Sequence, residues 1–332
     1  MIKSIQFTNF RALRDTTLPL SPFTLLVGPN GSGKSTVFRA LQEVGRFTPH
    51  THQTTLDFSL AASAGTPKDQ HIKMKVTDEA GTYEFGWNSA GRSEPSASDG
   101  SESEGAKSLR FQLQRLTVYS FNARVIAQPV NVEQSPSLGA DGSKCVAILD
   151  QLQSQYPDRF AELLQEFRRW LPEFDHILFD IPHQGSKSLA VRIAQGKHRL
   201  PASELSDGTL IALGLLTLAY LEDPPMVVCL EEPDRGLHPR LLRDVRDAVY
   251  RLAYPQQFGI ARKPVQVIAT THSPYFLSLF KEHPEEVVIA DKQALSTKFS
   301  RLSDRADLNE ILGSTDLGEA WYTGVLGGVP AR

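Results

Sequence analysis

The sequence predicts an α/β fold with a mixed sheet core, an antiparallel β segment and a helical region. Three observations predict it. Short apolar strands that end in glycine or acids alternate with helices, and strand-like pieces at 71–77, 82–87 and 109–121 follow one another. Most of 143–170 and 206–221 has helical spacing. A chain of 332 residues is long enough for one large or two modest domains with an ample core.

The N-terminal elements carry the clearest patterns. The opening MIKSIQFTNF alternates in polarity and is rich in strand formers, and Phe23 to Val27 is a short apolar run that predicts a buried strand. In STVFRALQEVG, Val37, Leu41 and Val44 fall on one helical face and Gly45 is a stop signal.

The middle of the chain is interrupted by a polar stretch, 89–108, which lacks large apolar side chains. Such a segment cannot offset its ordering entropy, so we expect a mobile surface loop, with a docking segment ordered by a partner as the alternative. Pro157 suits the first turn of a second helix within 143–170. SLAVRIAQGKHRL predicts a hairpin that turns near Gly196, and a long apolar helix follows at 206–221.

The C-terminal third predicts strands at Met226–Leu230, Val265–Thr271 and Val287–Ala290, with an amphipathic helix from Pro239. No heptad pattern is sustained over several turns, so we expect no long coiled coil.

Composition narrows the function classes. The net charge of −3 gives no global basic field, so any contact with DNA would use local patches. No apolar stretch is long enough for a bilayer and no signal-peptide pattern begins the chain, so we expect no membrane association. The two cysteines, Cys145 and Cys229, form no CxxC, which disfavours a disulfide scaffold and a zinc hook and fits a cytoplasmic location.

The segment GPNGSGKST, residues 28–36, matches GxxxxGK[ST] between a predicted strand and a predicted helix. Glycines there let backbone N–H groups surround phosphates, while Lys34 reaches the β- and γ-phosphates and the Ser35 hydroxyl ligates Mg²⁺. We therefore expect ATP and Mg²⁺ as cofactors. The expected nucleotide-binding residues of this segment are Asn30, Gly31, Gly33, Lys34, Ser35 and Thr36.

Two adjacent glutamates, Glu231 and Glu232, end the apolar run MVVCLEE. Adjacent carboxylates repel, and a cation would offset that repulsion. Because α/β folds place ligands at the carboxyl ends of strands, Glu231 is expected to hold Mg²⁺ and Glu232 to activate the water that attacks the γ-phosphate. The alternative is a surface pair of charges.

LSDGT, residues 205–209, opens the long apolar helix, with Ser206 as N-cap and Gly208 in the first turn. Together with GPNGSGKST, VVCLEEP and TTHSP, in that order, it resembles the ABC-class ATPases. The resemblance implies an ABC-type P-loop ATPase head with a helical signature lobe. It also implies that Ser206 and Gly208 contact the nucleotide of a second chain, in a homodimer that forms head-to-tail on ATP.

The same resemblance gives three further residues a role. His272, which ends VQVIATT, matches the switch histidine that contacts the γ-phosphate, so we assign it with Lys34 and Glu232 to catalysis. Arg11 in FTNFRAL resembles an N-terminal arginine that touches nucleotide in SMC-like heads. Gln128 is a possible match for the glutamine that contacts Mg²⁺.

Two motifs indicate which branch of the ABC class this chain resembles. Transporter ATPases carry LSGGQ and an aspartate–glutamate pair, whereas this chain has LSDGT and the pair Glu231–Glu232. PDRGLHP after the acids and NFRAL before the phosphate motif resemble the RecF, SMC and OLD branch. Residues 291–332 are too few for the Toprim domain that OLD nucleases append. The implied domains are 1–135 and 223–332, the two parts of the nucleotide-binding lobe, and 136–222, the signature lobe.

The resemblance implies that ATP-driven closure acts on DNA or on a separate effector, often a nuclease, in phage defence or DNA repair. An ATPase subunit of an ABC transporter and a scaffold that binds ATP with little hydrolysis are the alternatives. Trp321 and Tyr322 in the C-terminal tail either anchor a partner or fold back on the core. In PRLLRDVRDAVYRL, Asp244 and Asp247 make intrahelical pairing with the arginines more plausible than a phosphate-binding patch.

Overall fold

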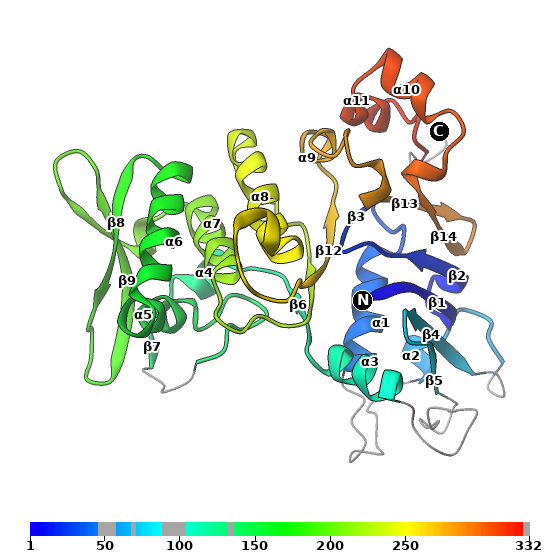
Figure 1. The fold of residues 1–332 in the computed structure, drawn as a ribbon, viewed down its shortest axis with the longest axis horizontal. Helices are drawn as coiled ribbons and strands as arrows, with labels where there is room; N and C mark the ends of the chain where they lie inside the picture. Colours follow the sequence, from blue (N-terminus) through cyan, green and yellow to red (C-terminus); the bar gives the residue numbers. More distant parts are fainter. Residues whose placement is uncertain (46–57, 68–70, 88–103, 132–135, 328–332) are drawn as a thin grey trace. The chain divides into compact units, whose positions relative to one another are not determined.

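The structure, a computed structural model, describes residues 1–45, 58–67, 71–87, 104–131 and 136–327 (Figure 1). The chain forms two compact units. The first contains 1–118, 225–229 and 262–332, and the second contains 119–224 and 230–261.

The first unit is built on a six-stranded mixed sheet. In order across the sheet its strands are β14 (Ser296–Arg301), β13 (Val287–Gln293), β3 (Phe23–Val27), β12 (Gln266–Thr271), β11 (Val227–Leu230) and β6 (Leu116–Tyr119). β3 runs parallel to both β12 and β13, while β14 returns antiparallel to β13. The predicted mixed sheet is confirmed, and every residue of β3 is buried because neighbours flank it on both sides.

A second sheet of this unit is the predicted antiparallel segment. Its strands, in order, are β2 (Leu13–Pro19), β1 (Ile2–Phe10), β4 (Ile72–Asp78) and β5 (Thr82–Trp87). Helix α1 (Lys34–Gly45) follows β3, and the short α2 (Phe58–Ala61) precedes β4. Phe7, Phe38 and Trp87, from β1, α1 and β5, belong to one buried core together with side chains of the six-stranded sheet. The core therefore fixes the start of α1, where the phosphate motif lies.

The prediction for 89–121 is wrong in its second half. Residues 104–108 begin helix α3 (Glu104–Gln114) rather than a loop, and the strand-like piece 109–121 contributes only β6. Leu109 and Leu113 are both buried, and their spacing of four places them on one helical face. The rest of the predicted loop, 89–103, lies outside the described residues.

The C-terminal segment folds onto the first unit. Helix α9 (Pro274–Ser278) contacts α11 (Leu317–Tyr322), which follows α10 (Leu308–Ser314). The helices approach so closely that a Cβ on Gly318 would lie 2.3 Å from the Pro274 carbonyl oxygen. Trp321 is buried, so this part of the tail folds back, whereas Tyr322 is 79% exposed.

The second unit combines helices with a small sheet. Its helices are α4 (Ala123–Ile126), α5 (Cys145–Gln155), α6 (Pro157–Trp170), α7 (Asp207–Ala219) and α8 (Leu242–Ala253). Its strands are β7 (Val130–Asn131), β8 (Phe174–Asp180), β9 (Ser186–Ile193) and β10 (Arg199–Pro201), with β9 between the others. Pro157 opens α6 as predicted, and the turn between β9 and β10 contains Gly196 at φ +80°.

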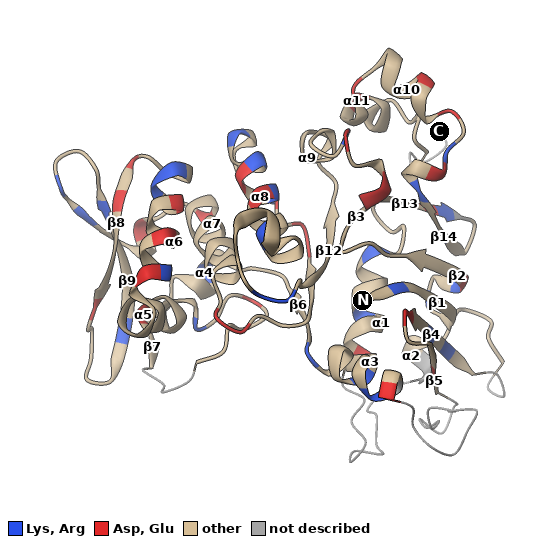
Figure 2. Cartoon of the chain, in the orientation of Figure 1, with Lys and Arg blue, Asp and Glu red and all other residues tan. Residues whose placement is uncertain are grey.

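Charged side chains on α6 and α8 pair both within and between helices. The expected intrahelical pairing is confirmed for Arg246 with Asp247 on α8, while other pairs link the two helices. Arg169 lies 2.9 Å from Asp244, and Arg251 lies 2.7 Å from Glu162. Figure 2 shows the basic and acidic residues interleaved on α8. Charged residues of α8 are thus engaged in ion pairs with α6 as well as within their own helix. Among the described helices, none is both long enough and apolar enough to cross a membrane.

Candidate functional site

The phosphate motif forms a tight loop between β3 and α1. Gly31 and Gly33 have φ values of +76° and +96°, which glycine adopts without strain. The ammonium of Lys34 is turned into the loop, where it donates to the carbonyl oxygens of Gly28 at 2.7 Å and Pro29 at 2.9 Å. Lys34 is only 5% exposed, so a buried positive charge lies inside the loop.

The hairpin of β13 and β14 lies directly against this loop. A Cβ on Gly28 would lie 2.5 Å from the Ala290 carbonyl oxygen, and one on Gly33 would lie 2.5 Å from Thr297 Oγ1. Both distances are too short for a side chain, so packing requires glycine at 28 and 33, and the φ of +96° is a second reason at Gly33.

The expected nucleotide-binding residues divide into an inner and an outer set. Lys34 and Gly33 are buried, whereas Asn30, Gly31 and Ser35 are exposed and Thr36 is half-buried. Ser35 thus presents its hydroxyl on the exposed side of the first turn of α1. Backbone N–H groups at a helix N-terminus, a lysine and a free hydroxyl are the donor set that a Mg²⁺–triphosphate requires.

Two buried polar atoms lack a hydrogen-bond partner among the described residues: Thr297 Oγ1, beside Gly33 of the phosphate loop, and Arg11 Nε. Arg11 lies in the turn between β1 and β2 at φ +52°, and its backbone N–H donates to Ala61 at 2.8 Å. Buried polar atoms are normally paired, so the unpaired hydroxyl of Thr297 beside the phosphate loop is an unusual feature of this site.

His272 follows the last residue of β12. Thr271 pairs in register with Val27, so His272 and the phosphate loop leave the same edge of the sheet. Thr271 Oγ1 accepts a hydrogen bond from the Ser273 N–H at 2.9 Å, and Ser273 caps α9. The backbone on both sides of His272 is therefore fixed.

The acid pair leaves the end of β11. The Glu231 N–H donates to the Tyr119 carbonyl at 2.9 Å, which aligns it with the end of β6. Glu232 has φ +46°, a conformation rare outside glycine, and its carbonyl accepts from the Arg235 N–H at 2.9 Å. Strain of this kind concentrates at functional sites.

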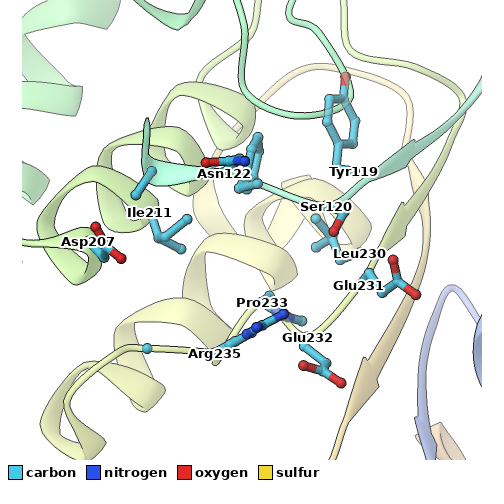
Figure 3. Close-up of a pocket in the computed structure, with 13 residues that line it drawn as sticks. Tyr119, Ser120, Asn122, Asp207, Ile211, Leu230, Glu231, Glu232, Pro233 and Arg235 are labelled. Atoms are coloured by element: carbon cyan, nitrogen blue, oxygen red, sulfur yellow. The ribbon is translucent and has the colours of Figure 1, made fainter. Parts of the chain in front are cut away.

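A cavity of about 550 Å³ in the second unit is lined by both glutamates. Figure 3 shows Glu231 and Glu232 on one side and Asp207, from the first turn of α7, across from them. Arg235 supplies a positive charge in the lining. The structure thus brings the acid pair and the start of the predicted signature helix to one cavity.

Ser206 is the N-cap of α7, as predicted, and its Oγ accepts from the Thr209 N–H at 3.1 Å. The residue is exposed. A Cβ on Gly208 would lie 2.9 Å from the Gly236 carbonyl oxygen, so this first turn packs against the loop that follows the acids.

Gln128 is exposed at the end of α4, where its amide donates to the Arg124 carbonyl at 3.2 Å. It is not among the residues that line the cavity; Ser120 and Asn122 are. Ser120 and Asn122 come after the end of β6, just as Glu231 and Glu232 come after the end of β11. A correct prediction of where β6 ends would have singled them out.

Among the described residues, no group of three or more histidine, cysteine, aspartate or glutamate side chains could hold a metal ion. Mg²⁺ in nucleotide sites uses one or two protein oxygens together with phosphate oxygens and water, and Ser35 and Glu231 fit that role by type.

Residues 23–278 match the AAA_21 family, described as "AAA domain, putative AbiEii toxin, Type IV TA system". The chain belongs to this family. An OLD nuclease of Thermus scotoductus is 23% identical over 382 residues, covering 97% of this chain and 69% of that protein. The AAA_21 chain is therefore an ATPase of the AAA/SMC-head type related to OLD nuclease, as the sequence motifs predicted.

The fold of the AAA_21 chain is similar to solved SMC heads. An SMC head bound to the C-terminal winged-helix domain of ScpA aligns with TM-score 0.60 and 15% identity, covering 93% of this chain and 99% of that one. An SMC head with an extended coiled coil, bound to the C-terminal domain of ScpA from Pyrococcus furiosus, aligns with TM-score 0.53 and 12% identity, covering 90% of this chain and 95% of that one. The predicted ATPase-head fold is confirmed.

Proposed function

We propose that this AAA_21 protein is a Mg²⁺-dependent ATPase whose ATP-driven pairing controls DNA or a separate effector. The buried ammonium of Lys34 carries the proposal, because it donates to loop atoms, the carbonyl oxygens of Gly28 and Pro29 and the hydroxyl of Ser32, and can transfer to phosphate oxygens. A charge that is 95% buried needs such partners.

The roles of the remaining residues follow from their chemistry. Lys34 and the loop N–H groups bind the β- and γ-phosphates, and Arg11 and His272 approach from the turn after β1 and the end of β12. Ser35 and Glu231 hold Mg²⁺, which supplies charge neutralisation on the phosphates. Glu232 accepts a proton from the attacking water, and its strained backbone keeps the carboxylate at the strand end.

The exposed N-terminus of α7 supports pairing of two chains. Ser206 is on the surface while its capping bond to Thr209 fixes its hydroxyl, and the helix dipole favours an anion there. We propose that this anion is the γ-phosphate held by a second copy, so that each nucleotide lies between two chains.

Light scattering of Glu232→Gln, with and without ATP and Mg²⁺, tests this proposal. The variant keeps binding and slows hydrolysis, so we expect its mass to double with ATP. Adding Ser206→Arg should abolish the doubling, whereas Ser203→Arg, at an exposed serine three residues earlier, should leave it intact. A mass that ATP leaves unchanged contradicts pairing of identical chains.

The downstream partner is proposed from the relatives. OLD nuclease and the AbiEii-type description point to nucleic acid or a toxin-like effector, and an SMC head binds ScpA in the solved complex. With net charge −3, any DNA contact must be local. The affinity for DNA, measured as the DNA concentration that half-stimulates the ATPase, should weaken by about 10³ between 50 and 200 mM salt for six phosphate contacts. Activity that neither DNA nor salt alters would favour a protein effector instead.

A further inference from the structure

Thr297, on β14, lies between the phosphate loop and the turn that carries Arg11. Its backbone N–H donates to the Ala12 carbonyl at 2.8 Å, next to Arg11. Its side chain faces Gly33, since the position of a Cβ on Gly33 is 2.5 Å from Thr297 Oγ1. One residue therefore contacts both segments expected to meet the nucleotide.

The hydroxyl of Thr297 is buried without a hydrogen-bond partner among the described residues. The residue as a whole is fully buried, at 0% exposure. Valine would fill the same space without that penalty, because the two side chains have the same shape. A buried hydroxyl without a partner destabilises the folded state, so its presence needs a state in which it is paired.

Another buried threonine of the same sheet shows the ordinary arrangement. Thr24, on β3, is 1% exposed, and its Oγ1 accepts from the Ser21 N–H at 2.9 Å. Burial within the six-stranded sheet therefore does not itself leave a hydroxyl unpaired. The difference at Thr297 is its neighbour, the phosphate loop.

We propose that Thr297 is a positioning residue for the phosphate loop, whose hydroxyl bonds to the backbone of that loop when nucleotide is bound. The loop in this structure is held by Lys34, which bonds to the Gly28 and Pro29 carbonyls. Moving the ammonium to a phosphate frees those carbonyls and lets the loop shift against Thr297. Pairing of the hydroxyl then favours the bound state. This inference rests on the proposed nucleotide binding.

Calorimetric titration of ADP and of a non-hydrolysable ATP analogue, with Mg²⁺, into the full chain tests the proposal. Thr297→Ser and Thr297→Ala differ only in the hydroxyl. We expect Ser to bind within about twofold of the wild type and Ala to bind about fivefold to tenfold more weakly, the effect of one lost neutral hydrogen bond. Thr297→Val should lose affinity as Ala does.

Thermal unfolding without nucleotide distinguishes a positioning role of Thr297 from a purely structural role in the fold. Thr297→Val removes an unpaired hydroxyl, so its midpoint should equal or exceed that of the wild type. Thr24→Val breaks a hydrogen bond, so its midpoint should fall while nucleotide affinity stays unchanged.

Equal affinity of the Ala and Ser variants would overturn the proposal, as would a Thr297→Val midpoint that falls as far as that of Thr24→Val. Failure of the proposed function looks different, because the wild type itself would then bind neither nucleotide. Should Thr297→Val fail to fold, the comparison of Ala with Ser still decides.

Discussion

The phosphate loop and the acid-lined cavity are built in opposite ways. The loop comes from nine consecutive residues, 28–36, and its shape follows from two glycines and a helix start. The cavity is lined by segments near 120, 207 and 231. Contiguous motifs fix geometry locally, whereas an assembled cavity depends on packing between distant segments.

Removing the positive charge from the phosphate loop should have the largest effect on nucleotide binding. Lys34→Ala takes away the ammonium that the loop encloses, so we expect nucleotide affinity to fall at least about a hundredfold. Titration of ADP measures this directly. Lys298→Ala, at an exposed lysine of β14, is the matched control and should bind as the wild type does. Undiminished binding by Lys34→Ala would refute the phosphate-loop assignment.

Within the assembled cavity, the chemical step should fail while binding survives. Glu232→Gln keeps the shape and removes the base, so kcat should fall by about 10²- to 10⁴-fold with nucleotide affinity within a few-fold of the wild type. Steady-state hydrolysis and titration separate the two quantities. Glu204→Gln, at an exposed glutamate just before α7, should change neither. Equal losses in both variants would assign the effect to general charge.

The same contrast explains what the sequence could and could not predict. The motif at 28–36, the acid pair and the N-cap Ser206 follow from short local patterns, and the structure places them at strand ends and a helix start. The sheet core followed from apolar runs such as Phe23–Val27. Ser120 and Asn122 were missed because the preceding strand was predicted to run to 121, whereas β6 ends at Tyr119.

Thr297 was missed for a related reason. Its strand, STKFSR, has one large apolar residue, so no alternation or apolar run marks it as β14. Its position depends on pairing with β13 and on contact with Gly33, which is more than 260 residues away in sequence. Helix α11 was not predicted either, because Gly318 is a poor helix former. Close packing against α9 requires a glycine at this position.

Gly208→Ala tests how tightly the assembled cavity is packed. The new Cβ would lie 2.9 Å from the Gly236 carbonyl oxygen, in the loop that follows the acids. We expect the free energy of unfolding to fall by about 1–3 kcal/mol and kcat to fall with it, because that loop must move. Chemical denaturation and hydrolysis rates measure both.

Gly313→Ala is the control for Gly208→Ala. It lies within α10 with nothing within 4 Å of its new Cβ, so it should stabilise the protein by about 0.5–1 kcal/mol. If Gly208→Ala is as well tolerated as this control, the first turn of α7 is not held against the acid-bearing loop.

The smallest effect is expected in the second unit away from the cavity, where Asp175 joins β8 to β9. Hydrogen bonds from Arg192 and then Lys197 hold the pKa of the Asp175 carboxyl well below its usual range. A depressed pKa stabilises the fold above the unfolded value, about 4, and this contribution is lost as pH falls below it. Asp175→Asn should therefore lower the unfolding midpoint above about pH 5, by no more than about 2 °C, because ion pairs that solvent still reaches contribute little. The difference should shrink toward zero as the pH falls below about 4. Calorimetric scans from pH 2.5 to 7 measure the difference in unfolding midpoint between the variant and the wild type. A difference that does not change with pH would mean that Asp175 contributes by packing and not by its charge.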